Sequence, residues 1–175
     1  MACSFSLDHY EHIIRSALEA GYVFMGFHEP ACGDSMQLFL RHDVDVSLNM
    51  AVRMAEVEAK LGVRSTYFVL PNSPIYNVLE NESIDMILQI AAMGHWIGLH
   101  IDLPKTYVMK SLTIKQVTYS IFDFFQQFLP LAPVVSFHRP SEQVFGMELF
   151  SLVNTYEDRF FRDIKYISDS RGQWR

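Results

Sequence analysis

The chain has 175 residues, of which 50% are hydrophobic and 14% are aromatic, so it is long and apolar enough for one globular domain with a buried core. Its formal net charge of -6 gives no reason to expect nucleic acid or an anionic membrane surface as a partner. Two cysteines outside any CxxC motif, no signal-peptide pattern and no apolar stretch near the roughly 20 residues of a membrane helix favour a cytoplasmic protein without a membrane span.

The chain before Pro71 predicts two helices and three strands, because its apolar residues recur first with helical and then with extended spacing. Ser6 and Ser47 are the expected N-caps of the two helices, and a glycine follows each helix end. In chain order the expected elements are a helix over 6–21, strands over 22–27 and 37–42, a helix over 48–61 and a strand over 65–70.

The rest of the chain continues the alternation of helix and strand. Thr113 and Gln116 have the spacing of a capping box, and Pro130 is the expected end of the helix that they begin. This pattern predicts one domain with a parallel sheet wrapped by helices, either open or closed as a barrel. The further expected elements are a helix over 83–93, a strand over 96–101, the capped helix, a strand over 134–138, a helix over 146–156 and a strand over 164–168.

The stretch QLFLRHDVDVS, residues 37–47, joins an apolar strand to a cluster of ionisable side chains. Asp43 and Asp45 are one residue apart on an extended segment, so their side chains point the same way. Two like charges held this close need a cation, an arginine or a shared proton to offset their repulsion.

Polar clusters follow the predicted strands at the ends where the strands of a parallel sheet converge. Two histidines and several aspartates there indicate a metal site of the kind that Zn²⁺ accepts. Each residue also has a structural interpretation: Asp45 can cap a helix, His100 can be a core histidine, and Arg139 can simply pair with a carboxylate. His95 is expected to be structural. The clusters are His42, Asp43 and Asp45, then His100 and Asp102, then His138 and Arg139, and finally Asp169.

Four segments in this order, RHDVD, GHWIGLHID, SFHRP and SDSRGQW, resemble the first four motifs of the polysaccharide deacetylase (carbohydrate esterase family 4, NodB-homology) domain. They are most similar to the divergent HDVD-type members associated with surface-polysaccharide biosynthesis, and the resemblance spans residues 38–174. It implies a deformed (β/α) barrel and the metal-dependent removal of an N-acetyl group from a sugar or a surface-polysaccharide precursor.

The resemblance also implies roles for individual residues. Asp43 matches the catalytic base, Asp45 a metal-binding aspartate and His100 the first metal-binding histidine. Arg139 matches the arginine that orients the base. Asp169 and Trp174 match the fourth motif, which supports that arginine and lines the acetyl pocket.

The chain departs from the family pattern at three points. Val44 separates the two aspartates, so the base and the ligand can be exchanged. Pro104 stands where a second metal-binding histidine is expected, which leaves His138 or Asp102 to complete the site; His138 is favoured because neutral imidazole suits Zn²⁺. The fifth motif has no counterpart before Arg175, so either the sequence is truncated or another group, with His42 the first candidate, protonates the leaving amine.

Two other functions remain open from the sequence. One is a barrel that binds carbohydrate or metal without turnover, and the other is a hydrolase of a C–N bond in a small amide. An incomplete barrel also predicts an open gap beside the strand at 165–168, through which copies of the chain can associate.

Overall fold

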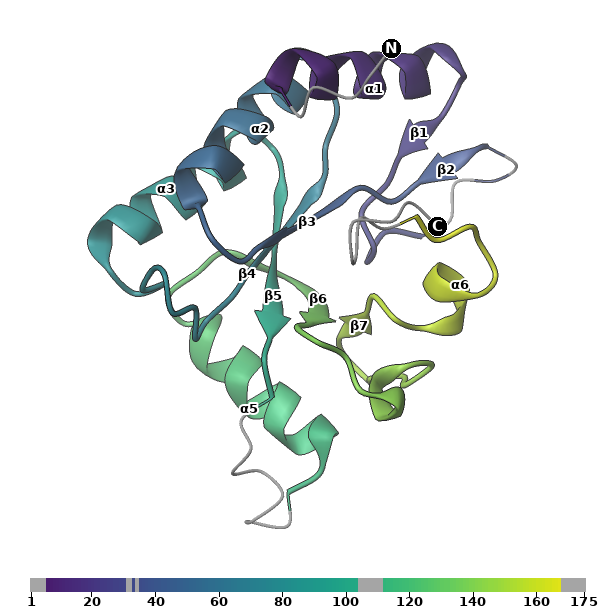
Figure 1. Cartoon of the computed structure of the whole chain (residues 1–175). Helices are drawn as coiled ribbons and strands as arrows, with labels where there is room; N and C mark the ends of the chain where they lie inside the picture. The colour runs from purple at the N-terminus through teal and green to yellow at the C-terminus, as the bar shows by residue number, and fades with distance from the viewer. Residues whose placement is uncertain (1–5, 31–32, 34, 104–111, 168–175) are drawn as a thin grey trace.

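The computed structural model describes residues 6–30, 33, 35–103 and 112–167, and its centre is a parallel sheet flanked by helices (Figure 1). The five strands of this sheet are β3 (Arg41–Val44), β4 (Thr66–Val69), β5 (Trp96–Ile101), β6 (Leu131–Phe137) and β7 (Val153–Asn154), in that spatial order. Each neighbouring pair is parallel. A separate parallel pair is formed by β1 (Val23–Phe24) and β2 (Gln37–Leu38).

Side-chain caps start the main helices at the predicted positions. The Ser6 hydroxyl accepts a hydrogen bond from the backbone at the start of α1 (Leu7–Glu19), and Ser47 does the same for α2 (Leu48–Lys60). The predicted capping box begins α5 (Ile114–Phe125). The other helical segments are α3 (Asn81–Ala92), the 3-10 turn η1 (Glu142–Val144) and α6 (Asp158–Phe161). Among these described helices, none has both the length and the apolar character that crossing a membrane requires.

The two faces of the sheet bury different clusters, as the period of two along a strand requires. Alternate residues such as Tyr67, Val69 and Leu99 face the larger cluster, which includes apolar side chains of α2, α3 and α5. Phe68 and Val134 face the opposite way and pack with Phe27 and Phe160 in a smaller cluster. The face of Phe68 is the one that carries the polar side chains of the candidate site.

The side chain of Arg41 links the two edges of the sheet. Arg41 begins β3, at one edge, and its guanidinium donates to the Thr155 hydroxyl at 2.9 Å and to the Tyr156 hydroxyl at 3.2 Å. Those two residues directly follow β7, at the other edge. In the described part of the chain the sheet is therefore curled but is not closed into a barrel by strand pairing.

The predicted α/β architecture is confirmed: a parallel sheet is flanked by helices, and α1, α2, α3 and α5 lie where helices were expected. The strand expected over 96–101 is β5, and those expected over 65–70 and 134–138 are β4 and β6 with shifted ends. The strand expected over 37–42 is divided into β2 and β3, which belong to different sheets.

Two predictions for the last part of the described chain were wrong. Residues 146–156 are not a helix but a turn that leads into β7, because the buried Asn154 side chain donates to the carbonyls of Val144 and Met147 and holds the chain in a loop. Residues 165–167 are not a strand. The strand beside β6 is β7, so the gap expected next to 165–168 is not where the sheet ends.

Candidate metal site

The residues of β3 alternate between the two faces of the sheet, and this alternation builds one side of the site. Both carboxylates approach the His100 imidazole: Asp43 Oδ1 is 3.8 Å from Nδ1, and Asp45 Oδ1 is 3.4 Å from Nε2. They lie on the same side, as their spacing predicts. His42, between Arg41 and Asp43, points to the opposite face, where its imidazole contacts Glu58.

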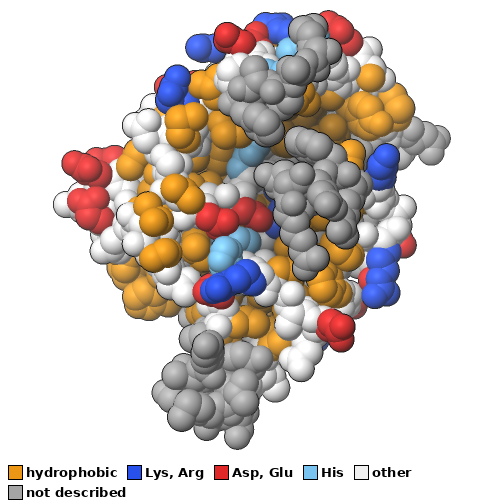
Figure 2. All heavy atoms as spheres, in the orientation of Figure 1, with side chains coloured by type: hydrophobic (Ala, Val, Ile, Leu, Met, Phe, Trp, Pro, Cys, Tyr) orange, Lys and Arg blue, Asp and Glu red, His pale blue; other side chains and the backbone are white. Residues whose placement is uncertain are grey.

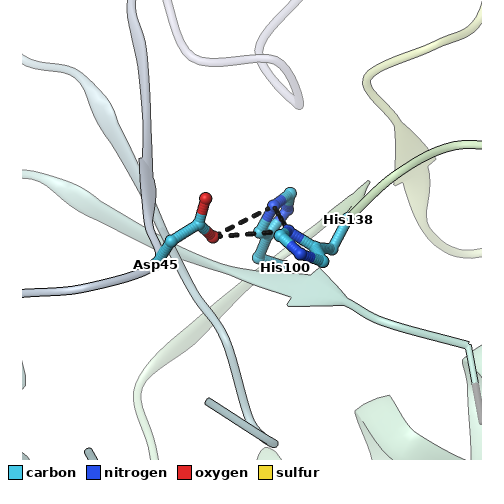
Figure 3. A group of neighbouring side chains, drawn as sticks. All are labelled: Asp45, His100 and His138. Carbon is cyan, nitrogen blue, oxygen red and sulfur yellow. Dashed lines mark hydrogen bonds and ion pairs between the residues drawn. The ribbon is translucent and has the colours of Figure 1, made fainter. Parts of the chain in front are cut away.

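Asp45, His100 and His138 come from three different strands or strand ends and meet at one point (Figure 3). The distance from Asp45 Oδ1 to His100 Nε2 is 3.4 Å, and that from Asp45 Oδ1 to His138 Nδ1 is 3.5 Å. The two imidazole nitrogens are 3.2 Å apart. The three atoms form a nearly equilateral triangle, and among the described residues they are the group that can hold a metal ion.

The carboxylate oxygen in this triangle lacks a hydrogen-bond donor among the described residues. Asp45 Oδ1 is buried and accepts no hydrogen bond from any described residue, although the side chain as a whole is 41% exposed. A buried carboxylate oxygen without a donor is costly unless a cation compensates it. The atom left without a donor is therefore the one best placed to bind a metal ion together with the two imidazoles.

His100 is held in the state that metal binding requires. Its side chain is buried, and its Nδ1 lies 3.2 Å from the Ser136 hydroxyl, so its Nε2 is directed at Asp45 and His138. Burial lowers the pKa of His100, and this effect outweighs the opposing attraction of Asp43 and Asp45. The neutral imidazole keeps a lone pair available as a ligand.

Asp43 is not part of the triangle but is held beside it by Arg41. The Arg41 guanidinium donates to Asp43 Oδ2 at 2.5 Å and lies over the rings of Tyr156 and Phe68. Burial alone would lower the pKa of Arg41, but the attraction of Asp43 and neighbouring tyrosines raises it above the ordinary value. Arg41 therefore holds the Asp43 carboxylate through a charge-assisted hydrogen bond.

Other residues expected at the site have different partners. Arg139 donates to Asp102 Oδ2 at 2.7 Å, so the arginine that contacts Asp43 is Arg41 and not Arg139 as expected. Asp102 is paired with Arg139 and is not in the Asp45–His100–His138 group. The third candidate ligand is therefore His138, which the sequence favoured over Asp102.

His42 does not lie at the site. Its Nε2 is 2.6 Å from Glu58 Oε1 and 3.1 Å from the Tyr10 hydroxyl, on the helix-covered face of the sheet. It was a poor candidate for protonating an amine at Asp43, because neighbouring residues in a strand point to opposite faces. His95 is structural, as expected: it is buried, with Nδ1 accepting from the Ser65 backbone N–H and Nε2 facing the Ala55 carbonyl.

A turn after β4 borders the site. The Tyr76 hydroxyl donates to the Val44 carbonyl at 2.5 Å, and the Ser73 hydroxyl donates to the Asp45 carbonyl at 3.1 Å. These bonds fix the backbone that carries Asp45. A shallow hollow lies on this turn and is lined by Pro71, Ser73, Pro74, Ile75, Tyr76 and Asn77.

Sequence reasoning did not assign roles to Arg41, Ser136 or Glu58. The signal for Arg41 was its position two residues before Asp43, which places both side chains on one face of the strand. Ser136 had a similar signal, two residues before His138. Asp169 and Trp174, which complete the fourth motif of the resemblance, lie outside the described residues.

Comparisons of this chain with protein-family models, with curated proteins and with solved structures found no match.

Proposed function

We propose that this chain is a zinc-dependent hydrolase that removes the N-acetyl group from a sugar or a surface-polysaccharide precursor. The proposal includes a deformed barrel of the polysaccharide deacetylase type, of which the curled parallel sheet would be the central part. The resemblance of the RHDVD, GHWIGLHID and SFHRP motifs supports this class of reaction, and the geometry of the candidate site supports the metal.

The observation that carries the proposal is the triangle of one carboxylate oxygen and two imidazole nitrogens beside a second carboxylate. Ligand atoms about 2 Å from a tetrahedral zinc ion lie about 3.3 Å from one another. The distances between the three candidate ligand atoms are 3.4, 3.5 and 3.2 Å. Three protein ligands with a fourth position left for water or substrate are typical of catalytic zinc sites.

Asp43 is the proposed base, and its surroundings suit that role. A divalent ion, when bound, supplies Lewis-acid activation of water and of the acetamide carbonyl. Asp43 would take the proton from the attacking water, and Arg41 holds the Asp43 carboxylate in place through Oδ2, with Oδ1 3.8 Å from Nδ1 of the candidate ligand His100.

Asp43 can also complete the reaction. Hydrolysis breaks the bond between the carbonyl carbon and the sugar nitrogen, and that nitrogen needs a proton to leave as an amine. Asp43 lies on the site face with Asp45 and His100 and would carry the proton taken from water, whereas His42 lies on the other face of the sheet. We therefore assign to Asp43 both the removal of the proton from water and its delivery to nitrogen.

The test is a comparison of two isosteric substitutions. Asp45→Asn should lose zinc, because an amide oxygen is a weaker ligand than a carboxylate, whereas Asp43→Asn should retain zinc and lose turnover by about 100-fold or more. Zinc content is measured by elemental analysis of the purified proteins, and turnover by acetate release from N-acetylglucosamine oligomers.

Three results would count against the proposal. Purified wild-type protein without zinc affinity would exclude the metal. Zinc binding without acetate release from any acetylated sugar would favour a binding domain or a hydrolase of another amide. Loss of zinc from Asp43→Asn and its retention in Asp45→Asn would exchange the two roles.

A further inference from the structure

Arg139 is an exposed cation next to the candidate metal site. It follows the candidate ligand His138 directly, and it pairs with Asp102, two residues after the candidate ligand His100. The Arg139 side chain is 74% exposed and has Asp102 as its single hydrogen-bond partner among the described residues. Most of the N–H groups of its guanidinium therefore face solvent beside the site.

The backbone of Arg139 is held in a conformation that few residues other than glycine adopt. Its φ angle is +52°, and it is the one non-glycine residue with positive φ in the described chain. Such strain persists where the surrounding structure or a function requires it. The turn directs the chain away from β6 immediately after His138, whose backbone N–H still bonds to the Ile101 carbonyl.

The two arginines near the site differ in how exposed their guanidinium groups are and in how many partners those groups have. Arg41 is almost covered, with a 14% exposed side chain, and its guanidinium donates to Asp43, Thr155 and Tyr156. Arg139 has the opposite environment, an open guanidinium with one partner. Arginine binds phosphate and carboxylate groups through paired N–H donors, so an open arginine next to a reaction site can bind an anionic group of a substrate.

The charges around the site make such binding depend on the metal. Three carboxylates (Asp43, Asp45 and Asp102) and two guanidiniums (Arg41 and Arg139) leave one net negative charge. A bound divalent ion changes this to one net positive charge, which favours an anion. Figure 2 shows acidic, histidine and basic side chains meeting near the centre of the face on view. Of the charged side chains named above, Asp45 and Arg139 are the most exposed, at 41% and 74%.

We propose that Arg139 is a specificity residue that binds an oxyanion group, a phosphate or a carboxylate, carried by the substrate next to the bond that is hydrolysed. This inference rests on the proposed function for the identity of that bond. The anion-binding property of Arg139 rests only on its exposure, its single partner and its place beside the two histidines.

The first experiment measures inorganic phosphate binding to the zinc-loaded protein by calorimetry. Arg139→Gln should weaken phosphate binding about tenfold, in the range of a lost charge-assisted hydrogen bond at a partly exposed position. Asp102→Asn should bind phosphate as tightly as the wild type or more tightly, because it removes a competing carboxylate. Arg15→Gln is the matched control, since Arg15 is also an exposed arginine paired with one carboxylate, Glu11, but lies on α1.

The different effects expected of Arg139→Gln and Asp102→Asn on phosphate affinity distinguish a role of Arg139 in binding from a purely structural role of the ion pair. If the ion pair only stabilised the turn, both Arg139→Gln and Asp102→Asn would weaken phosphate binding, and this result would overturn the inference. An unchanged affinity in Arg139→Gln would also overturn it. Arg139→Gly is a second variant that should fold even if Arg139→Gln does not, because glycine adopts positive φ without strain. It should bind phosphate as weakly as Arg139→Gln and melt no lower than the wild type.

The second experiment identifies the anion and keeps the inference distinct from the proposed function. Acetate release is compared for N-acetylglucosamine, its 6-phosphate and N-acetylmuramic acid, which differ in carrying no anion, a phosphate or a carboxylate. Arg139→Gln should raise KM about tenfold for the preferred anionic sugar and leave the neutral sugar unchanged. Equal losses for all three sugars would overturn the inference and leave the hydrolase in place. If no sugar releases acetate while Arg139→Gln still weakens phosphate binding, the proposed function fails and the anion site stands.

Discussion

Each residue of the segment from Arg41 to Asp45 has its role set by the face of the strand on which it lies. Arg41 and Asp43 form an ion pair on the site face, and Asp45 extends the same face to the two histidines. His42 and Val44 enter the opposite face, where His42 meets Glu58 and Val44 joins the larger core. One short stretch therefore supplies both a candidate metal ligand and a contact that anchors the strand to α2.

At this scale we predict that Arg41→Lys impairs turnover while zinc content stays unchanged. The Arg41 guanidinium spans Asp43, Thr155 and Tyr156, and the point charge of lysine cannot contact all three. We expect about a tenfold loss in acetate release and about 1–3 kcal/mol lower stability, the amount typical of charge-assisted hydrogen bonds. Chemical denaturation and elemental analysis measure the two effects, with the exposed Arg53→Lys as control. A loss of zinc in Arg41→Lys would contradict the separation between base and ligand.

Among the elements, β5 shows how close packing brings the site together. Its residues alternate between Ile97, Leu99 and Ile101 in the larger core and Gly98 and His100 on the site face. Gly98 leaves room for the ring of Phe68 on β4, which is fully buried. The sheet face next to His100 is therefore filled from the neighbouring strand.

Gly98→Ala tests this packing. A Cβ atom at position 98 would lie 2.5 Å from Phe68 Cε1 and 3.1 Å from the Val134 carbonyl oxygen. Overpacking of this kind typically costs 1–3 kcal/mol, so we expect a drop of about 2 kcal/mol in the free energy of unfolding and weaker zinc binding as β4 and β5 shift. Gly62→Ala is a useful contrast, because a Cβ there meets no atom within 4 Å and only its positive φ opposes the change. Full stability of Gly98→Ala would show that the Phe68 ring can move aside.

Across the whole molecule, the buried Glu58 carboxylate joins parts of the chain that are distant in sequence. Glu58 is completely buried on α2 and accepts hydrogen bonds from four side chains. The donors come from α1, β3 and the start of β4: they are Tyr10, His42, Ser65 and Tyr67. A buried carboxylate with this many donors connects these elements at low cost, whereas an unpaired one would be strongly destabilising.

The Glu58 network predicts a specific dependence of stability on pH. Burial alone would raise the pKa of Glu58, but the hydrogen bonds from His42, Ser65 and Tyr10 and the charge of His42 lower it below its ordinary value of 4.5. A depressed pKa means that the ionised carboxylate stabilises the fold above pH 4.5, and that this contribution is lost as the pH falls through the lower folded value. The other titratable groups next to Glu58 among the described residues are His95, Tyr10 and Tyr67.

Glu58→Gln should therefore be less stable than the wild type at pH 7, by about 3 kcal/mol as for a broken buried ion pair. The difference between the two proteins should shrink on acidification below pH 4.5, which denaturation curves over a pH series would measure. Glu56→Gln, an exposed change on the same helix, should show neither effect. A constant difference at all pH values would mean that the pKa of Glu58 is the same in the folded and the unfolded protein.

The sequence by itself determined most of the elements before residue 138 and the face on which the two aspartates lie, because both depend on local rules. Helix caps at Ser6, Ser47 and Thr113 are read from neighbouring residues, and the common direction of Asp43 and Asp45 follows from the geometry of an extended strand. The convergence of Asp45, His100 and His138 was also predictable, since the carboxyl ends of parallel strands meet at one edge.

Only the tertiary structure decided which side chains pair across the sheet. Arg41 and Arg139 are both next to motif residues in sequence, but the curl of the sheet brings Thr155 and Tyr156 to Arg41 and leaves Arg139 with Asp102. The end of the described chain was mispredicted because buried side-chain bonds of Asn154 override the helical pattern of residues 146–156. Such partners are far apart in sequence, so no local pattern encodes them, and the free energy of burying polar groups selects them only when the whole fold is formed.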